Sequence, residues 1–165
     1  MTVRAVVRLP SRVLKQEAEA VGPVPDADLA RDLVDTMRAS PACVGLAAPQ
    51  IGASKRAFAL DVTGHPKTRT CHGLVVLFDP AIIEAGGRKV GREGCMSVPD
   101  LTADVVRATE IVVRGRSPAG EDVVITTSGF EARAFQHEID HLDGLLILDR
   151  VQSLATDVFR RKVYK

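Results

Sequence analysis

The chain has 165 residues, and its 22 basic and 21 acidic side chains give a formal net charge of +1 at pH 7. A chain of this length fits one domain and buries about two thirds of its unfolded surface, so it needs no structural metal or disulfide in order to fold. The balanced charge gives no general sign of a nucleic-acid or anionic-membrane partner. We therefore expect one domain over residues 1–165.

The N-terminus and the cysteines indicate the compartment. Arginines and a proline interrupt the first ten residues before they reach the length of a signal peptide, and no apolar span is long enough to cross a membrane. Cys43, Cys71 and Cys95 are an odd number, which favours free thiols or a metal ligand over a disulfide framework. We expect a cytoplasmic protein with no membrane partner.

The predicted elements begin with a short strand at residues 3–7 and an amphipathic helix at residues 26–38. Short strands broken by Gly, Pro and Asp follow at residues 56–62, 74–78, 81–84, 88–91, 105–114 and 121–126. The last two flank the turn Ser117-Pro118-Ala119-Gly120, which predicts a hairpin. Mostly antiparallel strands followed by a helix predict an α+β fold.

A run of small residues lies between the first helix and the strands. Residues 43–52 read Cys-Val-Gly-Leu-Ala-Ala-Pro-Gln-Ile-Gly. With little side-chain bulk, this backbone can approach a ligand closely. Gln50 carries the one side-chain amide of the run, so it is the candidate for a neutral hydrogen-bonding group there.

Residues 128–144 predict a buried helix with marked ends. Ser128 and Glu131 have the spacing of a capping box, and Asp143-Gly144 supplies the stop. An apolar stripe lies between these ends, formed by Phe130, Ala134, Phe135, Ile139 and Leu142. Histidines on such a helix are not casual surface residues.

Two histidines and a glutamate on this helix have the spacing of a hydrolytic metal site. At about 100° per residue, His137 and His141 lie on one face, one turn of about 5.4 Å apart, where two neutral imidazoles can share one cation. Glu138 is rotated away from that face but can accept the proton of a bound water. The pattern H-E-x-x-H therefore encodes two ligands and a base. The alternative is a pair of core histidines held by hydrogen bonds.

A catalytic site of this kind typically takes three protein ligands, so the sequence has to supply one more. Cys95 is our candidate, because a thiolate suits a divalent transition metal and Gly94 before it permits a close approach. A buried inert thiol is the alternative interpretation. A rival cluster lies in the loop that contains Cys71, His72 and His65.

Two carboxylates adjoin these candidate ligands. Glu93 stands two residues before Cys95, and Asp140 directly precedes His141. The hydrolytic chemistry does not require either of them. Each one either orients a metal ligand or forms an ordinary ion pair, for which Arg107 is the expected partner.

Three segments together resemble the peptide deformylase family, and the likeness covers nearly the whole chain. They are residues 45–50, Gly-Leu-Ala-Ala-Pro-Gln, residues 93–97, Glu-Gly-Cys-Met-Ser, and residues 136–141, Gln-His-Glu-Ile-Asp-His. The resemblance implies an α+β fold, in which short antiparallel strands pack around a central metal-binding helix, with an N-terminal and a C-terminal helix. It also implies a single deformylase-like catalytic domain over residues 1–165.

The family removes the N-formyl group from the initiator methionine of new polypeptides and releases formate. The resemblance implies Fe(2+) as the cofactor, although Zn, Ni or Co also suit a sulfur and two nitrogens. The implied metal ligands are Cys95, His137 and His141. Glu138 would be the general base and acid, while Gln50 and the backbone N–H of Met96 would stabilise the oxyanion.

The resemblance places Cys43, Val44 and Gly45 beside the substrate, and the sequence departs from the family near them. Cys43 stands where the motif usually begins with glycine, so its thiol is expected to narrow the mouth of the site. Met96 replaces the commoner leucine, with little effect expected because its role is through the backbone. Thr102 lies in a stretch where many relatives carry an arginine near the substrate backbone.

N-formylmethionyl peptides are the expected partners, and no direct nucleic-acid site is evident. Residues 151–165 are expected to form a helix with a basic end, which offers a contact with the ribosome or is simply a solvated helix terminus. The basic residues are Arg160, Arg161, Lys162 and Lys165. Two other functions remain open, namely a deformylase-like amidase for another formylated or acylated small molecule, and a non-catalytic metal-holding relative that binds nascent chains or the ribosome.

Overall fold

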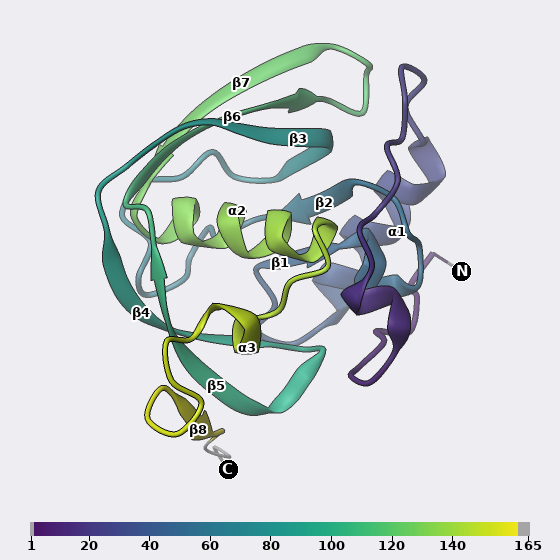
Figure 1. The fold of residues 1–165 in the computed structure, drawn as a ribbon. Coiled ribbons are helices and arrows are strands. Elements are labelled where there is room, and N and C mark those ends of the chain that lie inside the picture. Colours follow the sequence, from purple (N-terminus) through teal and green to yellow (C-terminus); the bar gives the residue numbers. More distant parts are fainter. Residues whose placement is uncertain (1, 162–165) are drawn as a thin grey trace.

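The computed structural model describes residues 2–161 and has a mixed α+β fold with antiparallel sheets. The larger sheet has five strands in the order β1 (Gly45–Ala47), β2 (Ala57–Leu60), β3 (Val75–Gly86), β6 (Glu110–Arg116) and β7 (Asp122–Ser128). The smaller sheet has the order β4 (Lys89–Cys95), β5 (Val98–Arg107) and β8 (Val158–Arg160). Helix α2 (Gly129–Leu142) crosses the middle of the molecule, and strands surround it (Figure 1).

The boundaries of two predicted strand regions differ in the structure. The strand expected at residues 105–114 is split between β5 and β6, because both backbone groups of Ala108 bond to the side-chain amide of Gln136 on α2, at 2.9 Å each. The strands expected at residues 74–78 and 81–84 are one strand, β3, with an irregularity between Phe78 and Ala81. The hairpin of β6 and β7 is confirmed.

The predicted first helix is confirmed as α1 (Ala27–Ala39). The carboxylate of Asp26 caps it by accepting the backbone N–H of Leu29 at 3.0 Å. Its apolar face packs on β1 and β2 in a core that also contains Phe78. Helix α1 therefore supports β1, which belongs to the segment of small residues, and its neighbour β2.

Helix α2 packs the apolar residues of its stripe into a core shared with the larger sheet. Phe135 meets Phe58 of β2 edge to face, with ring centroids 5.6 Å apart. The predicted capping box is wrong, because the Ser128 side chain makes no capping bond and Glu131 instead accepts the Thr127 hydroxyl at 2.8 Å. The helix ends before Gly144, whose φ is 75°, as the stop signal predicts.

The predicted N-terminal strand is wrong. Residues 3–7 form no strand in the structure. Val7 N–H donates to the carbonyl of Gln50 at 2.8 Å, while the Val7 carbonyl accepts the hydroxyl of Ser97 at 2.8 Å. These partners belong to two separate segments, so the N-terminal chain joins no strand ladder there.

The predicted C-terminal helix is also wrong over residues 151–161. A four-residue helix, α3 (Ile147–Arg150), comes before this segment, and β8 lies within it. Residues 158–160 are extended because their backbone groups pair with the edge of β5. The expected contact with the ribosome rested on this helix, which residues 151–161 do not form. Two of its basic residues, Lys162 and Lys165, lie outside the described residues.

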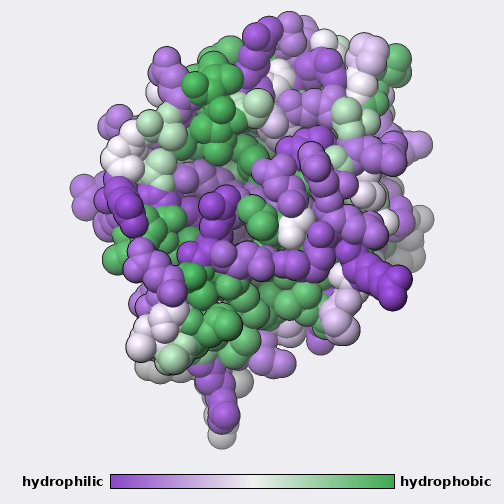
Figure 2. Space-filling model, viewed as in Figure 1, coloured by the Kyte–Doolittle hydropathy of each residue, from purple (hydrophilic) through white to green (hydrophobic). Residues whose placement is uncertain are grey.

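The described surface is mixed in polarity. On the face shown in Figure 2, hydrophilic residues predominate and hydrophobic residues reach the surface in separate groups. Within residues 2–161, no helix has both the length and the apolar character that crossing a membrane requires.

Candidate active site

Three of the candidate ligands come together in the structure. Potential ligand atoms of Cys95, His137 and His141 all lie within 4.8 Å of one another. The Cys95 sulfur is 3.4 Å from Nε2 of His141, and the two imidazole centroids are 5.0 Å apart. No comparable group forms from the rival cluster within residues 2–161.

The backbone explains how the cysteine reaches the helix. Cys95 is the last residue of β4 and pairs with Val98 across a two-residue turn, next to a shift in register at Gly94. The two histidines lie one turn apart on α2, as their spacing predicts. One strand end and one helix therefore supply the whole cluster.

Glu93 fixes the orientation of His137. Its Oε1 atom lies 2.9 Å from Nδ1 of His137, while Arg107 donates to both carboxylate oxygens at 2.9 and 3.0 Å. Burial alone would raise the pKa of Glu93, but the hydrogen bonds from His137 and Arg107 hold it well below its ordinary value. An ionised Glu93 keeps the proton of His137 on Nδ1, so Nε2 faces the cluster.

The carboxylate of Asp140 is held by ion pairs with two arginines and makes no hydrogen bond to the cluster among the described residues. Arg107 donates to it at 2.5 Å and Arg150 at 2.7 Å. Both Asp140 and Arg107 are buried. The expected pairing with Arg107 therefore holds for both carboxylates, and Glu93 in addition orients a histidine.

The electrostatics of the cluster suit a cation. Burial would raise the pKa of Cys95, but the imidazoles of His141 and His137 hold it well below its ordinary value. Burial would lower the pKa of His137, but Cys95 and Glu93 hold it well above its ordinary value. The thiolate of Cys95 and the carboxylate of Glu93 thus stabilise positive charge on His137. When the imidazole loses its proton, a bound cation can supply the positive charge in its place.

Glu138 lies beside the cluster with an unused oxygen. Its side chain is buried, and its Oε1 atom has no hydrogen-bond partner among the described residues. Burial raises the pKa of Glu138, and the opposing effect of the two histidines does not cancel that rise. A buried, unpaired carboxylate oxygen next to three potential ligands fits a site that binds a metal and a polar reactant.

Gln50 directs its amide nitrogen towards the cluster. Its Oε1 atom accepts the backbone N–H of Ala47 at 3.0 Å, and its Nε2 atom donates to the hydroxyl of Ser97 at 3.1 Å. The same nitrogen lies 3.5 Å from the sulfur of Cys95. Sequence reasoning missed Ser97 as the residue that fixes this amide, although it follows the candidate ligand by two positions.

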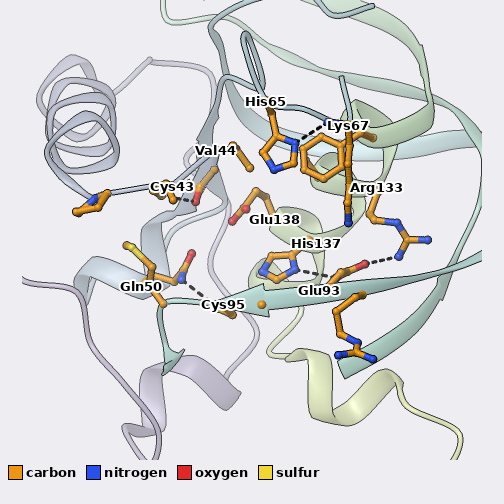
Figure 3. A pocket seen from close by; sticks show the side chains of 18 of the residues that line it. Cys43, Val44, Gln50, His65, Lys67, Glu93, Cys95, Arg133, His137 and Glu138 are labelled. Atoms are coloured by element: carbon orange, nitrogen blue, oxygen red, sulfur yellow. Dashed lines mark hydrogen bonds and ion pairs between the residues drawn. The ribbon is translucent and has the colours of Figure 1, made fainter. Parts of the chain in front are cut away.

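A cavity of about 320 Å³ opens above these groups (Figure 3). The three residues expected beside the substrate, Cys43, Val44 and Gly45, line this cavity. Met96, in the turn after Cys95, also lines it. The Cys43 thiol donates to the Gly45 carbonyl at 3.1 Å, and burial, followed by the nearby Glu138, raises the pKa of Cys43 to about 12. Its sulfur is therefore a neutral part of the wall.

The cavity also has a polar rim that sequence reasoning missed. The rim residues are His65, Lys67, Arg92, Arg133 and Arg161. They come from four segments far apart in the sequence, because only His65 and Lys67 share a loop, so no local pattern predicted that these residues would line one cavity. Thr102 does not line the cavity; it pairs with Gly94 in the smaller sheet, and its hydroxyl lies 3.5 Å from Arg92.

Comparisons with known proteins agree on one family. The family model described as polypeptide deformylase matches residues 3–157. The chain is 42% identical to a peptide deformylase of Carboxydothermus hydrogenoformans over 157 residues, covering 94% of this chain and 97% of the relative. It is also 42% identical to a peptide deformylase of Desulforudis audaxviator, covering 98% and 99% of the two chains.

Solved structures show the same likeness. A peptide deformylase from Legionella pneumophila is 36% identical, with a TM-score of 0.82 and coverage of 92% of this chain and 88% of that one. A class I type b peptide deformylase from Acinetobacter baumannii, solved with Met-Ala-Ser bound, is 34% identical, with a TM-score of 0.83 and coverage of 92% and 100%.

Proposed function

The chain belongs to the polypeptide deformylase family, and on this premise we propose that it removes the N-formyl group from the formylmethionine that begins new polypeptides. The observation that carries the proposal is the convergence of Cys95, His137 and His141 beside the unpaired carboxylate oxygen of Glu138. We assign the activity to a single catalytic domain of residues 1–165 in the cytoplasm.

The residues of the cluster fit a divalent transition metal. Cys95, His137 and His141 would hold it through one sulfur and two nitrogens, with Glu93 orienting the first histidine. The family resemblance favours Fe(2+), and the same donors accept Zn, Ni or Co. When bound, the metal supplies the Lewis acidity that makes water a nucleophile near neutral pH.

We assign the roles of general base and general acid to Glu138. Its free Oε1 atom accepts a proton from the attacking water, and the same oxygen returns that proton to the amine as the formyl C–N bond breaks. Water and the N-formyl peptide are thereby converted into formate and a peptide with a free amino terminus. The raised pKa of Glu138 suits a group that both takes up and releases a proton.

Gln50 and the backbone N–H of Met96 are assigned to the oxyanion. Attack by water places negative charge on the formyl oxygen, and donors fixed in advance stabilise that charge without reorganising. The bonds of the Gln50 amide to Ala47 and Ser97 support such a fixed position. Loss of one donor of this kind typically lowers kcat by about 10²–10³-fold.

The substrate is assigned to the cavity, against the wall formed by Cys43, Val44 and Gly45. The relative from Acinetobacter baumannii was solved with Met-Ala-Ser bound, a peptide that begins with methionine. That ligand corresponds to a product of the reaction proposed here. It supports a formylmethionyl peptide as the substrate of this chain.

The test is formate release from a matched pair of peptides. Protein purified without oxygen and loaded with Fe(2+) or Ni(2+) is given formyl-Met-Ala-Ser or acetyl-Met-Ala-Ser, and formate or acetate is measured. We expect saturable release of formate, at least about 100-fold faster than release of acetate, because the extra methyl group meets a confined site. Full metal occupancy without formate release would exclude the proposed activity, and preferred acetate release would indicate an amidase of another specificity.

A further inference from the structure

The rim of the cavity carries an excess of positive charge. Four cationic side chains line the cavity, namely Lys67, Arg92, Arg133 and Arg161. The two carboxylates that line it, Glu93 and Glu138, are both buried. The exposed part of the wall is therefore cationic, while the acidic groups lie at its base.

Two of the four cations are already engaged by the protein. Arg133 donates to Glu93 at 2.6 Å and to two backbone carbonyls, at 2.8 and 2.9 Å. Arg92 donates to Asp104 at 2.8 Å and lies 3.6 Å from the ring centroid of Phe159. Their guanidinium groups are committed to holding the structure together.

The other two cations, Lys67 and Arg161, are free to bind a ligand. Within residues 2–161, neither side chain has an ion pair or a side-chain hydrogen bond. Lys67 is exposed, and Arg161 is half-buried. Each lines a cavity in which the proposed reacting groups form the base.

The fold fixes these two cations on different sides of the cavity mouth. The guanidinium group of Arg161 packs on Gly94, where any Cβ atom would collide with it, and the Arg161 backbone N–H donates to Asp100 at 2.9 Å. Lys67 lies on a loop beside His65, which stacks on Phe130. Figure 3 shows His65 and Lys67 across the cavity from the strand that carries Cys95.

We propose that Lys67 and Arg161 determine substrate preference by binding an acidic side chain in the first two residues after the formylmethionine. This inference rests on the proposed function. With the formyl group at the base of the cavity, the following residues have to leave through the mouth. A carboxylate there passes between two cations that have no competing acidic partner among the described residues.

The expected effect is moderate because the mouth is open to solvent. A single exposed ion pair contributes little, and two cations acting on one carboxylate give an expected preference of about three- to tenfold in kcat/KM. Salt screens such contacts, so the ratio of kcat/KM between an acidic and a neutral peptide should fall towards one at about 1 M ionic strength.

The test compares peptides with amidated C-termini, so that no terminal carboxylate interferes. They are formyl-Met-Ala-Ala, formyl-Met-Asp-Ala, formyl-Met-Ala-Asp and formyl-Met-Lys-Ala. Metal-loaded full-length protein is assayed for formate release, and dissociation constants are measured in parallel on metal-loaded Glu138→Gln protein. The variants are Lys67→Gln and Arg161→Gln, with Arg69→Gln and Arg160→Gln as controls that remove the same charge from the same segments outside the cavity lining.

We expect one of the Asp peptides to exceed the Ala peptide by about three- to tenfold, and the Lys peptide to fall below it. Each rim variant should reduce this ratio, and the control variants should preserve it. Equal values for all peptides, or a ratio unchanged in both rim variants, would overturn the inference. If no peptide is turned over, the proposed function fails, and the ratio of dissociation constants still decides whether the rim selects acidic chains.

Discussion

Gly45 and Glu138 are packed so closely that a Cβ atom on Gly45 would lie 2.5 Å from Oε2 of Glu138. Gly45 is in β1, and its backbone is not in the left-handed region, so the site needs glycine there for space and not for conformation. Strand β1 therefore forms the wall against which the proposed base is positioned. This contact links a glycine of the first motif to the helix of the third.

Replacing Gly45 with Ala should displace the Glu138 carboxylate. Because the colliding atom is the end of a side chain, we expect a small change in Tm but a fall in kcat/KM of at least about tenfold, since small misplacements of a reacting group are costly. Gly86→Ala is the matched control, because a Cβ atom there meets nothing within 4 Å. Equal activity in the two variants would show that the contact does not position the base.

Replacing Glu93 with Gln should weaken metal binding. The carboxylate that holds the Nδ1 proton of His137 becomes a neutral amide, and loss of such an outer partner typically lowers metal affinity by about 10–100-fold. Competition with a chelator measures the affinity. Asp104→Asn, which removes a nearby carboxylate that does not contact a proposed ligand, should leave it unchanged. An unaltered affinity in the Glu93 variant would contradict this role.

The lowered pKa of Glu93 predicts that the free energy of unfolding depends on pH. The folded-state pKa of Glu93 lies below its ordinary value of 4.5, so its stabilising contribution is present above about pH 4.5 and is lost as the pH falls towards the folded-state value. Breaking this buried pair should cost about 3 kcal/mol at neutral pH. The free energy of unfolding, measured with denaturant on metal-free protein, should therefore be higher for the unsubstituted chain than for Glu93→Gln. This difference in free energy should shrink below pH 4.5. A constant difference would contradict the assignment.

Local sequence signals account for the helix that carries the two histidines. The spacing of His137 and His141 and the stop at Asp143-Gly144 predict where α2 carries its histidines and where it ends. Both signals act within one helix, so they do not depend on contacts with distant segments. The third proposed ligand, Cys95, had to be inferred from its residue type and from the family resemblance, because strand pairing sets its position.

The remaining differences come from contacts between segments distant in sequence. Glu131 fits a local capping box, but it lies buried and accepts hydrogen bonds from Thr127 and from His72 of a distant loop. Residues 158–160 form a strand because β5 offers an edge for pairing. Arg107 joins Glu93 and Asp140 across 14 and 33 positions of sequence. No local pattern encodes such distances.

The cysteines should differ in their reactivity. Because burial raises the pKa of Cys43 to about 12, little thiolate is present at pH 8, whereas Cys71 is exposed. Brief treatment with iodoacetamide at pH 8 should modify Cys71 before Cys43, as peptide mass spectrometry can measure, and labelling of Cys43 should increase as the pH rises. Equally rapid labelling at pH 8 would contradict the buried, neutral thiol in the cavity wall.

The most direct test of the central proposal measures metal content and formate release on the same anaerobic samples of native and Glu138→Ala protein. Both proteins should bind one metal per chain through Cys95, His137 and His141. Native protein should release formate from formyl-Met-Ala-Ser, and the variant should lose about 10²–10⁴-fold in kcat, the usual contribution of a general acid and base. A fully metal-loaded variant with near-native turnover, or a fully loaded native protein that releases no formate, would contradict the account.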